Sequence, residues 1–253
     1  MIRGDSQFVA ERAGSDFFAL LRWLGNSGGG MGRQIFFISG TDTGVGKTVL
    51  ATLLTRHLRQ RGLNAVGLKP ICSGGREDAL SLWRASEKIL SLDEINPWHF
   101  RAPLSPLLAA RKDRKRVHLE DVVAHIRAIQ KRFEAVVVEG AGGLLSPLGE
   151  NFDSRDLLLA LRATPIVVCP NRLGAANQVL LVWEALPKAA RRNAQIVLMN
   201  PRHFDAAAQT NPSLLARFIG PKRIHLLPHL RDNASPRLAA VLLSKLVLSC
   251  SRR

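Results

Sequence analysis

The segment GTDTGVGKT, residues 40–48, contains the side chains with the clearest chemical use. A glycine-rich turn followed by Lys-Thr at a helix start binds phosphate, because backbone N–H groups and the helix N-terminus attract anions. The lysine of such loops, here Lys47, reaches the β and γ phosphates, and the hydroxyl, here Thr48, ligates magnesium. The usual G-x-x-x-x-G-K-[ST] spacing would place a glycine at Thr41, but the glycine is Gly40. The segment predicts a phosphate-binding loop with one additional residue.

A second motif, LKPICSGGREDALSL, places Lys69 at the end of an apolar run. Ligands of open α/β sheets bind beyond the carboxyl ends of the strands, so Lys69 and the turn that begins at Ser73 could hold an anion. Asp78 begins a helical pattern and could ligate magnesium. The alternative is a surface lysine and an acid that the helix dipole favours at its N-terminus.

Three further polar residues follow apolar runs. Glu139 in AVVVEGAGG ends a strand where P-loop enzymes place an acid that contacts magnesium. Asn200 in IVLMNP could read the Watson–Crick edge of a base, and an Asn-Pro turn is its alternative role. Asn177 in RLGAANQVLL lies near a helix start, where capping is its alternative role.

The net charge of +16 raises the question of nucleic-acid or acidic-membrane binding. The basic residues are scattered except for RKDRKR, residues 111–116, and no aromatic side chains alternate with them. We interpret this run as a solvated loop or helix face and expect neither a nucleic-acid nor a membrane partner. The three cysteines have no C-x-x-C spacing, which favours a reducing cytoplasm.

Residues 1–30 differ from the rest of the sequence. They end in the linker GNSGGG, and a strand pattern begins within four residues of Met31. We expect residues 1–30 to be a disordered extension or a misassigned start, with Met31 as the natural first residue, and residues 31–253 to form one domain. The alternative is a genuine, weakly ordered N-terminal arm.

Apolar runs alternate with amphipathic helical patterns after Met31. The helical patterns include residues 49–60 and 119–133. Runs that are apolar throughout are typical of parallel strands covered by helices on both faces. The sequence predicts an α/β fold with a doubly wound, mostly parallel sheet, like that of P-loop NTPases. The predicted strands are residues 35–39, 65–69, 135–139, 165–169, 194–199 and 223–227.

The motifs together resemble the dethiobiotin synthetase family over roughly residues 33–235. GTDTGVGKT, LKPICSG, EDALSL, NPWHF, VEGAGG and RLGAANQVLL occur in the family's order. The resemblance implies a cytoplasmic ligase of biotin biosynthesis that uses ATP and Mg²⁺. Its substrates would be 7,8-diaminopelargonate and CO2, which form a carbamate that ATP phosphorylates before the ureido ring closes. It also implies a homodimer with the substrate site near the subunit interface, where residues 142–145 and Asn177 would fall.

The resemblance also implies roles for individual residues. Lys69 matches the active-site lysine, Thr43 and Ser73 match hydroxyls on the substrate side, and Lys47 holds phosphate. Magnesium would be held by Thr48, Asp78 and Glu139. Asn200 matches the residue that reads adenine. The expected nucleotide-binding residues are Gly44, Val45, Gly46, Lys47, Thr48, Val49, Asp78, Glu139, Gly140, Ala141, Gly142, Asn200, Pro228 and Asn233.

The competing function is a partitioning-type switch ATPase that acts on DNA or membrane. Its loop begins K-G-G-x-G-K-T, and the position of that first lysine is Asp42 here. The net charge of +16 would suit such a protein, whereas LKPICSGG has no use in it.

Overall fold

The computed structural model describes residues 33–230 and 235–250, and the side chains of 235–238 are not described. The predicted extension of residues 1–30 therefore lies outside the described residues. A six-stranded sheet with the order β10-β9-β8-β1-β5-β2 forms the centre of the fold, and all its neighbouring strands are parallel. The strands are β1 (Gln34–Gly40), β2 (Ala65–Leu68), β5 (Ala135–Glu139), β8 (Thr164–Pro170), β9 (Gln195–Met199) and β10 (Ile224–Leu227).

The strand order confirms the predicted doubly wound sheet. From β1 the chain crosses to β2 at one edge, returns through β5, and then continues through β8, β9 and β10 on the other side. The direction of winding thus reverses around β1. In sheets of this kind, ligands bind beyond the carboxyl ends of the strands at this reversal. The predicted phosphate-binding loop follows β1 directly.

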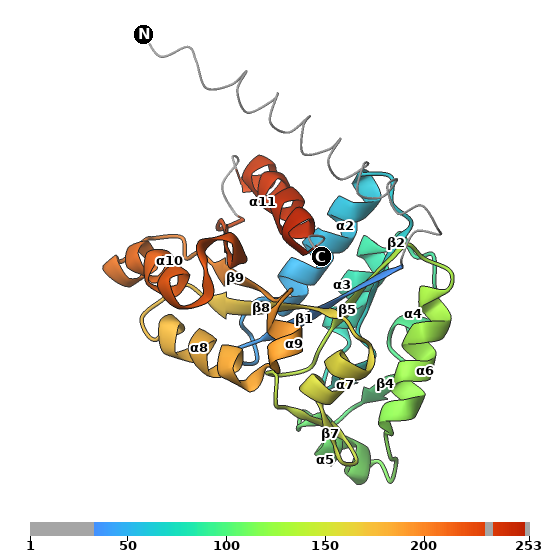
Figure 1. Cartoon of the computed structure of the whole chain (residues 1–253). Helices are drawn as coiled ribbons and strands as arrows, with labels where there is room; N and C mark the ends of the chain where they lie inside the picture. Colours follow the sequence, from blue (N-terminus) through green and yellow to red (C-terminus); the bar gives the residue numbers. More distant parts are fainter. Residues whose placement is uncertain (1–32, 231–234, 251–253) are drawn as a thin grey trace.

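Helices cover both faces of the sheet (Figure 1). One face carries α2 (Lys47–Gln60), α3 (Glu77–Ala85) and α11 (Ser235–Cys250), and α2 contacts both of the others. The other face carries α6 (Leu119–Gln130), α7 (Ser154–Ala160), α8 (Ala175–Ala185) and α10 (Ala206–Ile219). No helix in the described part of the chain is long and apolar enough to cross a membrane. The shorter helices are α4 (Leu92–Ile95), α5 (Pro106–Lys112), α9 (Lys188–Arg191) and the 3₁₀ helix η1 (Pro221–Arg223).

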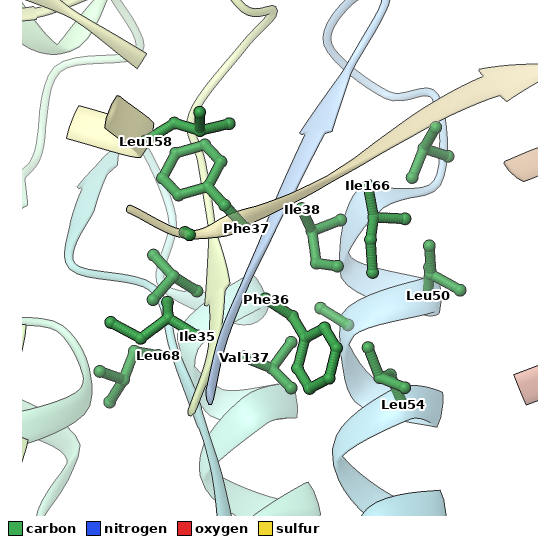
Figure 2. Packing of buried hydrophobic residues seen from close by; sticks show 14 of the residues in the cluster. Ile35, Phe36, Phe37, Ile38, Leu50, Leu54, Leu68, Val137, Leu158 and Ile166 are labelled. Carbon is green, nitrogen blue, oxygen red and sulfur yellow. The ribbon is translucent and has the colours of Figure 1, made fainter. Parts of the chain in front are cut away.

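The central strand β1 joins the two layers of the core. Its Phe36 points toward Leu50 and Leu54 of α2, whereas Phe37 points to the opposite face and lies near Leu158 (Figure 2). All five side chains are almost completely buried. Successive side chains of a strand face opposite sides, so an uninterrupted apolar run requires helices on both faces. Burial of each such side chain contributes about 1.5–3 kcal/mol.

Three features of the fold differ from the prediction. Helix α6 ends at Gln130 rather than at residue 133, because residues 131–133 form a turn that leads into β5. Helix α11 was not predicted, although its buried residues Ala239, Leu242, Leu243, Leu246 and Val247 recur at helical spacing. Two small sheets were also missed. They pair β3 (Ile71–Ser73) with β4 (Trp98–Phe100) and β6 (Pro147–Gly149) with β7 (Phe152–Asp153).

Helix α11 packs beside α2 through a buried polar contact. The Ser244 hydroxyl lies 3.1 Å from His57 Nε2 and accepts a hydrogen bond from Arg61. Burial, with the nearby Arg61 charge, lowers the pKa of His57 to about 4. His57 is therefore a neutral packing residue at ordinary pH.

Candidate active site

The phosphate-binding loop, residues 40–48, turns sharply between β1 and α2. Gly46 has a φ of 101° and Gly44 a φ of 72°, values that residues other than glycine rarely adopt. A Cβ built on Gly40 would lie 2.6 Å from Val45 Cγ2, so the tight approach falls at position 40 and not at 41. No side chain caps the N-terminus of α2. The N–H groups of its first turn are therefore available to an anion.

Lys47 folds back over this loop. Its Nζ donates a hydrogen bond to the carbonyl oxygen of Asp42 at 2.7 Å, and the side chain is buried. Burial lowers the pKa of Lys47 to about 8, and the nearby Lys69 charge adds to the shift. A phosphate at the helix N-terminus would offer the ammonium a charged partner in place of a carbonyl oxygen.

Thr48 connects two carboxylates from different parts of the sequence. Its hydroxyl lies 2.8 Å from Asp78 Oδ1 and 2.8 Å from Glu139 Oε1. Asp78 lies in the first turn of α3, and Glu139 is the last residue of β5. Two of the predicted magnesium ligands, Asp78 and Glu139, therefore both contact the third, Thr48, although Thr48 and Glu139 are 91 positions apart in sequence.

Lys69 completes this group, which we call the charged cluster (Thr48, Lys69, Asp78 and Glu139). Its Nζ lies 2.6 Å from Glu139 Oε1, 3.0 Å from Asp78 Oδ2 and 3.2 Å from the Gly140 carbonyl oxygen. Strand β2 ends one residue earlier than predicted, at Leu68, so Lys69 is the first residue beyond it. Lys69 and Glu139 are buried, whereas the Asp78 side chain is 43% exposed.

Burial and the neighbouring opposite charges shift the pKa values of the charged cluster in opposite directions. Burial alone would lower the pKa of Lys69, but the Glu139 and Asp78 carboxylates outweigh it and raise that pKa above its ordinary value. Burial would raise the pKa of Asp78, but Lys69 outweighs it and holds that pKa below its ordinary value. Burial raises the pKa of Glu139 although Lys69 opposes the shift. Glu139 Oε2 is buried and has no hydrogen-bond partner in the described part of the chain, so it can accept a further cationic or donor group.

The backbone of Lys69 is fixed by residues that the sequence reasoning did not single out. Its N–H donates to the Ile95 carbonyl oxygen at 3.1 Å, and its carbonyl oxygen accepts a 2.7 Å bond from Asn96 Nδ2. Arg76 in turn donates to Asn96 Oδ1 at 3.1 Å. The NPWHF motif contains Asn96, but only the three-dimensional structure shows that this asparagine supports Lys69.

The glycine turn after β5 packs against the phosphate-binding loop. A Cβ on Gly143 would lie 3.4 Å from the Gly40 carbonyl oxygen, and one on Gly142 would lie 3.9 Å from Thr43 Oγ1. Gly142 has a φ of 65°. Gly142 and Gly143 therefore lie beside the phosphate-binding loop, and the predicted nucleotide contacts of Gly140, Ala141 and Gly142 stay a prediction.

Ser73 lies at the end of β3 rather than in direct contact with the charged cluster. Its hydroxyl donates to the Leu104 carbonyl oxygen at 2.6 Å. The following Gly74 is held to β4, because its N–H donates to the Phe100 carbonyl oxygen and its own carbonyl oxygen lies 2.8 Å from His99 Nε2. The predicted anion-holding turn is thus a fixed structure.

Asn200 follows β9 at the same edge of the sheet. The preceding Met199 contacts the phosphate-binding loop, since a Cβ on Gly46 would lie 2.8 Å from Met199 Cε. Asn171 Nδ2 donates to Asn200 Oδ1 at 2.9 Å, a contact that the sequence reasoning missed. Pro228 follows β10 and is half-buried.

Two other predicted positions have different outcomes. Asn177 lies in the first turn of α8, and the cap of that helix is Gly174, so capping is not its role. Asn233 lies outside the described residues.

Several known proteins have sequences similar to this chain. A family profile described as "AAA domain" matches residues 34–237. An "ATP-dependent dethiobiotin synthetase BioD" of Anaeromyxobacter sp. (strain K) is 43% identical over 197 residues, which cover 76% of this chain and 88% of that protein. The chain belongs to the dethiobiotin synthetase family. A family member of the same printed name from Bacillus licheniformis is 36% identical over 207 residues, 79% of this chain and 88% of that protein.

A solved structure outside this family has a similar fold. A ParA family ATPase from Chlorobium tepidum TLS covers 87% of this chain and 96% of its own, with a TM-score of 0.52 and 15% identity. This likeness concerns the fold and confirms the P-loop NTPase-like architecture.

Proposed function

We propose that this protein is an ATP-dependent dethiobiotin synthetase, a ligase of biotin biosynthesis. The observation that carries the proposal is the 43% identity to a dethiobiotin synthetase over 88% of that protein's length. The loop, Lys69 and Glu139 of the matching motifs also lie at one edge of the sheet, where a single nucleotide and substrate could meet them.

The reaction forms two C–N bonds at the expense of ATP. One amine of 7,8-diaminopelargonate takes up CO2 as a carbamate, and a carbamate oxygen attacks the γ-phosphorus with loss of ADP. The second amine then attacks the carbonyl carbon of this mixed anhydride. The C–O bond breaks, phosphate leaves with the former carbamate oxygen, and the ureido ring closes.

The phosphate-binding loop would hold the triphosphate of ATP. Backbone N–H groups from Gly44 to Val49 bind its oxygens, and Lys47 exchanges the Asp42 carbonyl for phosphate. Gly140, Ala141 and Gly142 border the same space. At the base end, Asn200, Pro228 and Asn233 would contact the nucleoside.

The charged cluster fits a magnesium ion. Two carboxylates and a hydroxyl are oxygen ligands, and magnesium is commonly held by one or two carboxylates together with substrate phosphates. The buried, unpartnered Glu139 Oε2 supplies an acceptor for such a cation. Thr48, Asp78 and Glu139 would hold it, and when bound it would neutralise charge on the β and γ phosphates.

Lys69 would act on the carbamate. Its ammonium is buried and kept charged by Glu139 and Asp78, so it can stabilise negative charge on the carbamate and on the mixed anhydride. Thr43 and Ser73 would offer hydroxyls to the substrate. Release of Ser73 from the Leu104 carbonyl oxygen would accompany that contact.

We also infer a homodimer that uses α8. This helix buries only Ala175 and Val179, while Leu181 is 64% exposed and Leu173, just before the helix, is 83% exposed. Leu145, beyond the glycine turn of the active site, is 52% exposed. A second copy of the chain packed on these leucines would remove apolar surface from water next to the substrate site. The three free cysteines fit a cytoplasmic enzyme.

The proposal is tested by incubating the protein with diaminopelargonate, bicarbonate, Mg²⁺ and ATP. We expect dethiobiotin, detected by its mass, and no product when ATP or bicarbonate is omitted. ATP hydrolysis that DNA or lipid vesicles stimulate, and that diaminopelargonate leaves unchanged, would instead support the switch-ATPase function.

A further inference from the structure

Three asparagines form a hydrogen-bonded group at the base end of the sheet, which we call the asparagine ladder (Asn171, Asn200 and Asn211). Asn171 Nδ2 donates to Asn200 Oδ1 and to the Ala208 carbonyl oxygen, both at 2.9 Å. Asn211 Nδ2 donates to Asn171 Oδ1 at 3.1 Å and to the Arg172 carbonyl oxygen at 2.9 Å. Asn171 and Asn211 are buried, whereas Asn200 is half-buried.

Two backbone carbonyls fix the orientation of all three amides. A carbonyl oxygen only accepts, so the Asn211 atom facing Arg172 O and the Asn171 atom facing Ala208 O must be NH2 groups. Asn171 Oδ1 then faces the Asn211 NH2 group. The Asn171 NH2 group has its second hydrogen directed at Asn200, so Asn200 must place its oxygen there.

The ladder therefore determines which groups Asn200 can offer a ligand. Its Nδ2 has no hydrogen-bond partner among the described residues, and its Oδ1 keeps one of two acceptor positions. A donor beside an acceptor complements a base edge with a ring-nitrogen acceptor beside an amino group. Adenine has such an edge, and asparagine commonly pairs with it in this way. Hypoxanthine has a carbonyl oxygen in place of the amino group.

The ladder is also attached to the strands that carry the phosphate site. Asn171 N–H donates to the Met199 carbonyl oxygen, and Asn200 N–H donates to the Leu227 carbonyl oxygen, both at 2.8 Å. These bonds continue the pairing of β8 with β9 and of β9 with β10 beyond the strand ends. Because Met199 contacts Gly46, the ladder and the phosphate-binding loop hold a fixed separation.

We propose that Asn171 and Asn211 are positioning residues that make the site selective for adenine nucleotides by fixing the Asn200 amide. This inference rests on the proposed function, in which Asn200 contacts the base. Because the Asn200 amide is already held in one orientation, binding costs no free energy to order it. Its oxygen would face the carbonyl oxygen of hypoxanthine, and two acceptors repel each other. Selectivity then depends on residues that do not touch the nucleotide.

The test compares the dissociation constants of ATP and ITP, measured by calorimetry with Mg²⁺. In Asn171→Ala, the Asn200 amide is free to turn, and we expect the preference for ATP over ITP to fall about three- to tenfold, the value of about one neutral hydrogen bond. In Asn211→Ala, Asn171 keeps its bond to the Ala208 carbonyl oxygen, so the preference should fall less. Asn171→Asp cannot donate to Asn200 Oδ1, so it should turn the amide over and reduce the preference further. Asn64→Ala, which loses a bond to the Arg132 carbonyl oxygen at the far end of the sheet, is the matched control.

Each outcome has a separate meaning. An unchanged ATP preference in the folded ladder variants, or no preference in the unaltered protein, would overturn the inference. If one Asn171 variant does not fold, the other Asn171 variant decides. If the unaltered protein selects ATP in a ladder-dependent manner but makes no dethiobiotin from diaminopelargonate, the proposed function fails and the role of the ladder stands.

Discussion

The two ends of the proposed nucleotide site are built from different chemistry. The charged cluster joins one ammonium, two carboxylates and a hydroxyl within 3.0 Å contacts, with Lys69 and Glu139 buried. The asparagine ladder lies on the other side of β1 in the strand order, after β8 and β9. It joins three neutral amides by contacts of similar length. Both groups lie beyond the carboxyl ends of parallel strands.

This difference indicates that the two groups have different roles in the reaction. A buried charge is stabilised by an opposite charge beside it and is costly without one. Removal of one charged side chain therefore leaves the others in the cluster without a partner. Neutral amides contribute about 0.5–1.5 kcal/mol per hydrogen bond, but their donors and acceptors have a direction. We therefore expect the charged cluster to control the rate of the reaction and the ladder to control the choice of nucleotide.

The largest expected effect is that of Lys69→Gln. It removes the positive charge that faces the carbamate, so dethiobiotin formation should fall by about a thousandfold while most of the ATP affinity remains. Product formation by mass and ATP binding by calorimetry check this. Lys115→Gln removes an exposed lysine and is the control. Ring closure at the unaltered rate in Lys69→Gln would remove Lys69 from the mechanism.

Thr48→Val should have the next largest effect. Valine keeps the shape of threonine but loses the hydroxyl that contacts both Asp78 and Glu139, so kcat/KM for ATP should fall about a hundredfold and the Mg²⁺ requirement should rise. A magnesium titration of the rate measures both. An unchanged magnesium requirement would contradict the assignment of this hydroxyl.

Much of the charged cluster can be predicted from the sequence. Parallel strands end at one edge, so Lys69 after β2 and Glu139 at the end of β5 must lie near the loop that follows β1. The glycine at position 40 is also explicable, because Val45 leaves no room for a Cβ there. Lys69 and Glu139 can be predicted as site residues because charged side chains are costly to bury without a partner.

The ladder and the supports of Lys69 could not be predicted in the same way. Asn171 follows a strand as Asn200 does, but its partner Asn211 lies 40 positions later within α10. The Asn96 side chain supports Lys69 by donating to its backbone carbonyl oxygen. Every residue has such an oxygen, so the sequence does not indicate this contact.

The pH dependence should separate the two ends of the site. Lys47 has a pKa of about 8 in the free protein, and it binds phosphate only when protonated. The value of kcat/KM for ATP should therefore be flat below pH 8 and fall about tenfold per pH unit above it. The ladder has no titratable group, so the ATP-to-ITP ratio should stay constant until the hypoxanthine ring of ITP itself loses its N1 proton in alkaline solution. A ratio that changes in parallel with the rate would refute the separation.

The smallest expected effect concerns Thr52, one turn beyond Thr48 in α2. Its Oγ1 is buried and has no hydrogen-bond partner within residues 33–230 and 235–250. Thr52→Val should therefore raise the free energy of unfolding by about 1 kcal/mol and leave the activity unchanged. Chemical denaturation measures the change. A Thr52→Val variant that is no more stable than the unaltered protein, or that loses activity, would contradict this expectation.

The most direct test of the account follows the oxygen of bicarbonate. The phosphorylated carbamate passes one carbamate oxygen to phosphate when the ring closes. In a short incubation with heavy-oxygen-labelled bicarbonate, diaminopelargonate, Mg²⁺ and ATP, the released phosphate should carry one labelled oxygen for each dethiobiotin formed. Unlabelled phosphate, released by attack of water on ATP, would contradict a carbamate intermediate in this site.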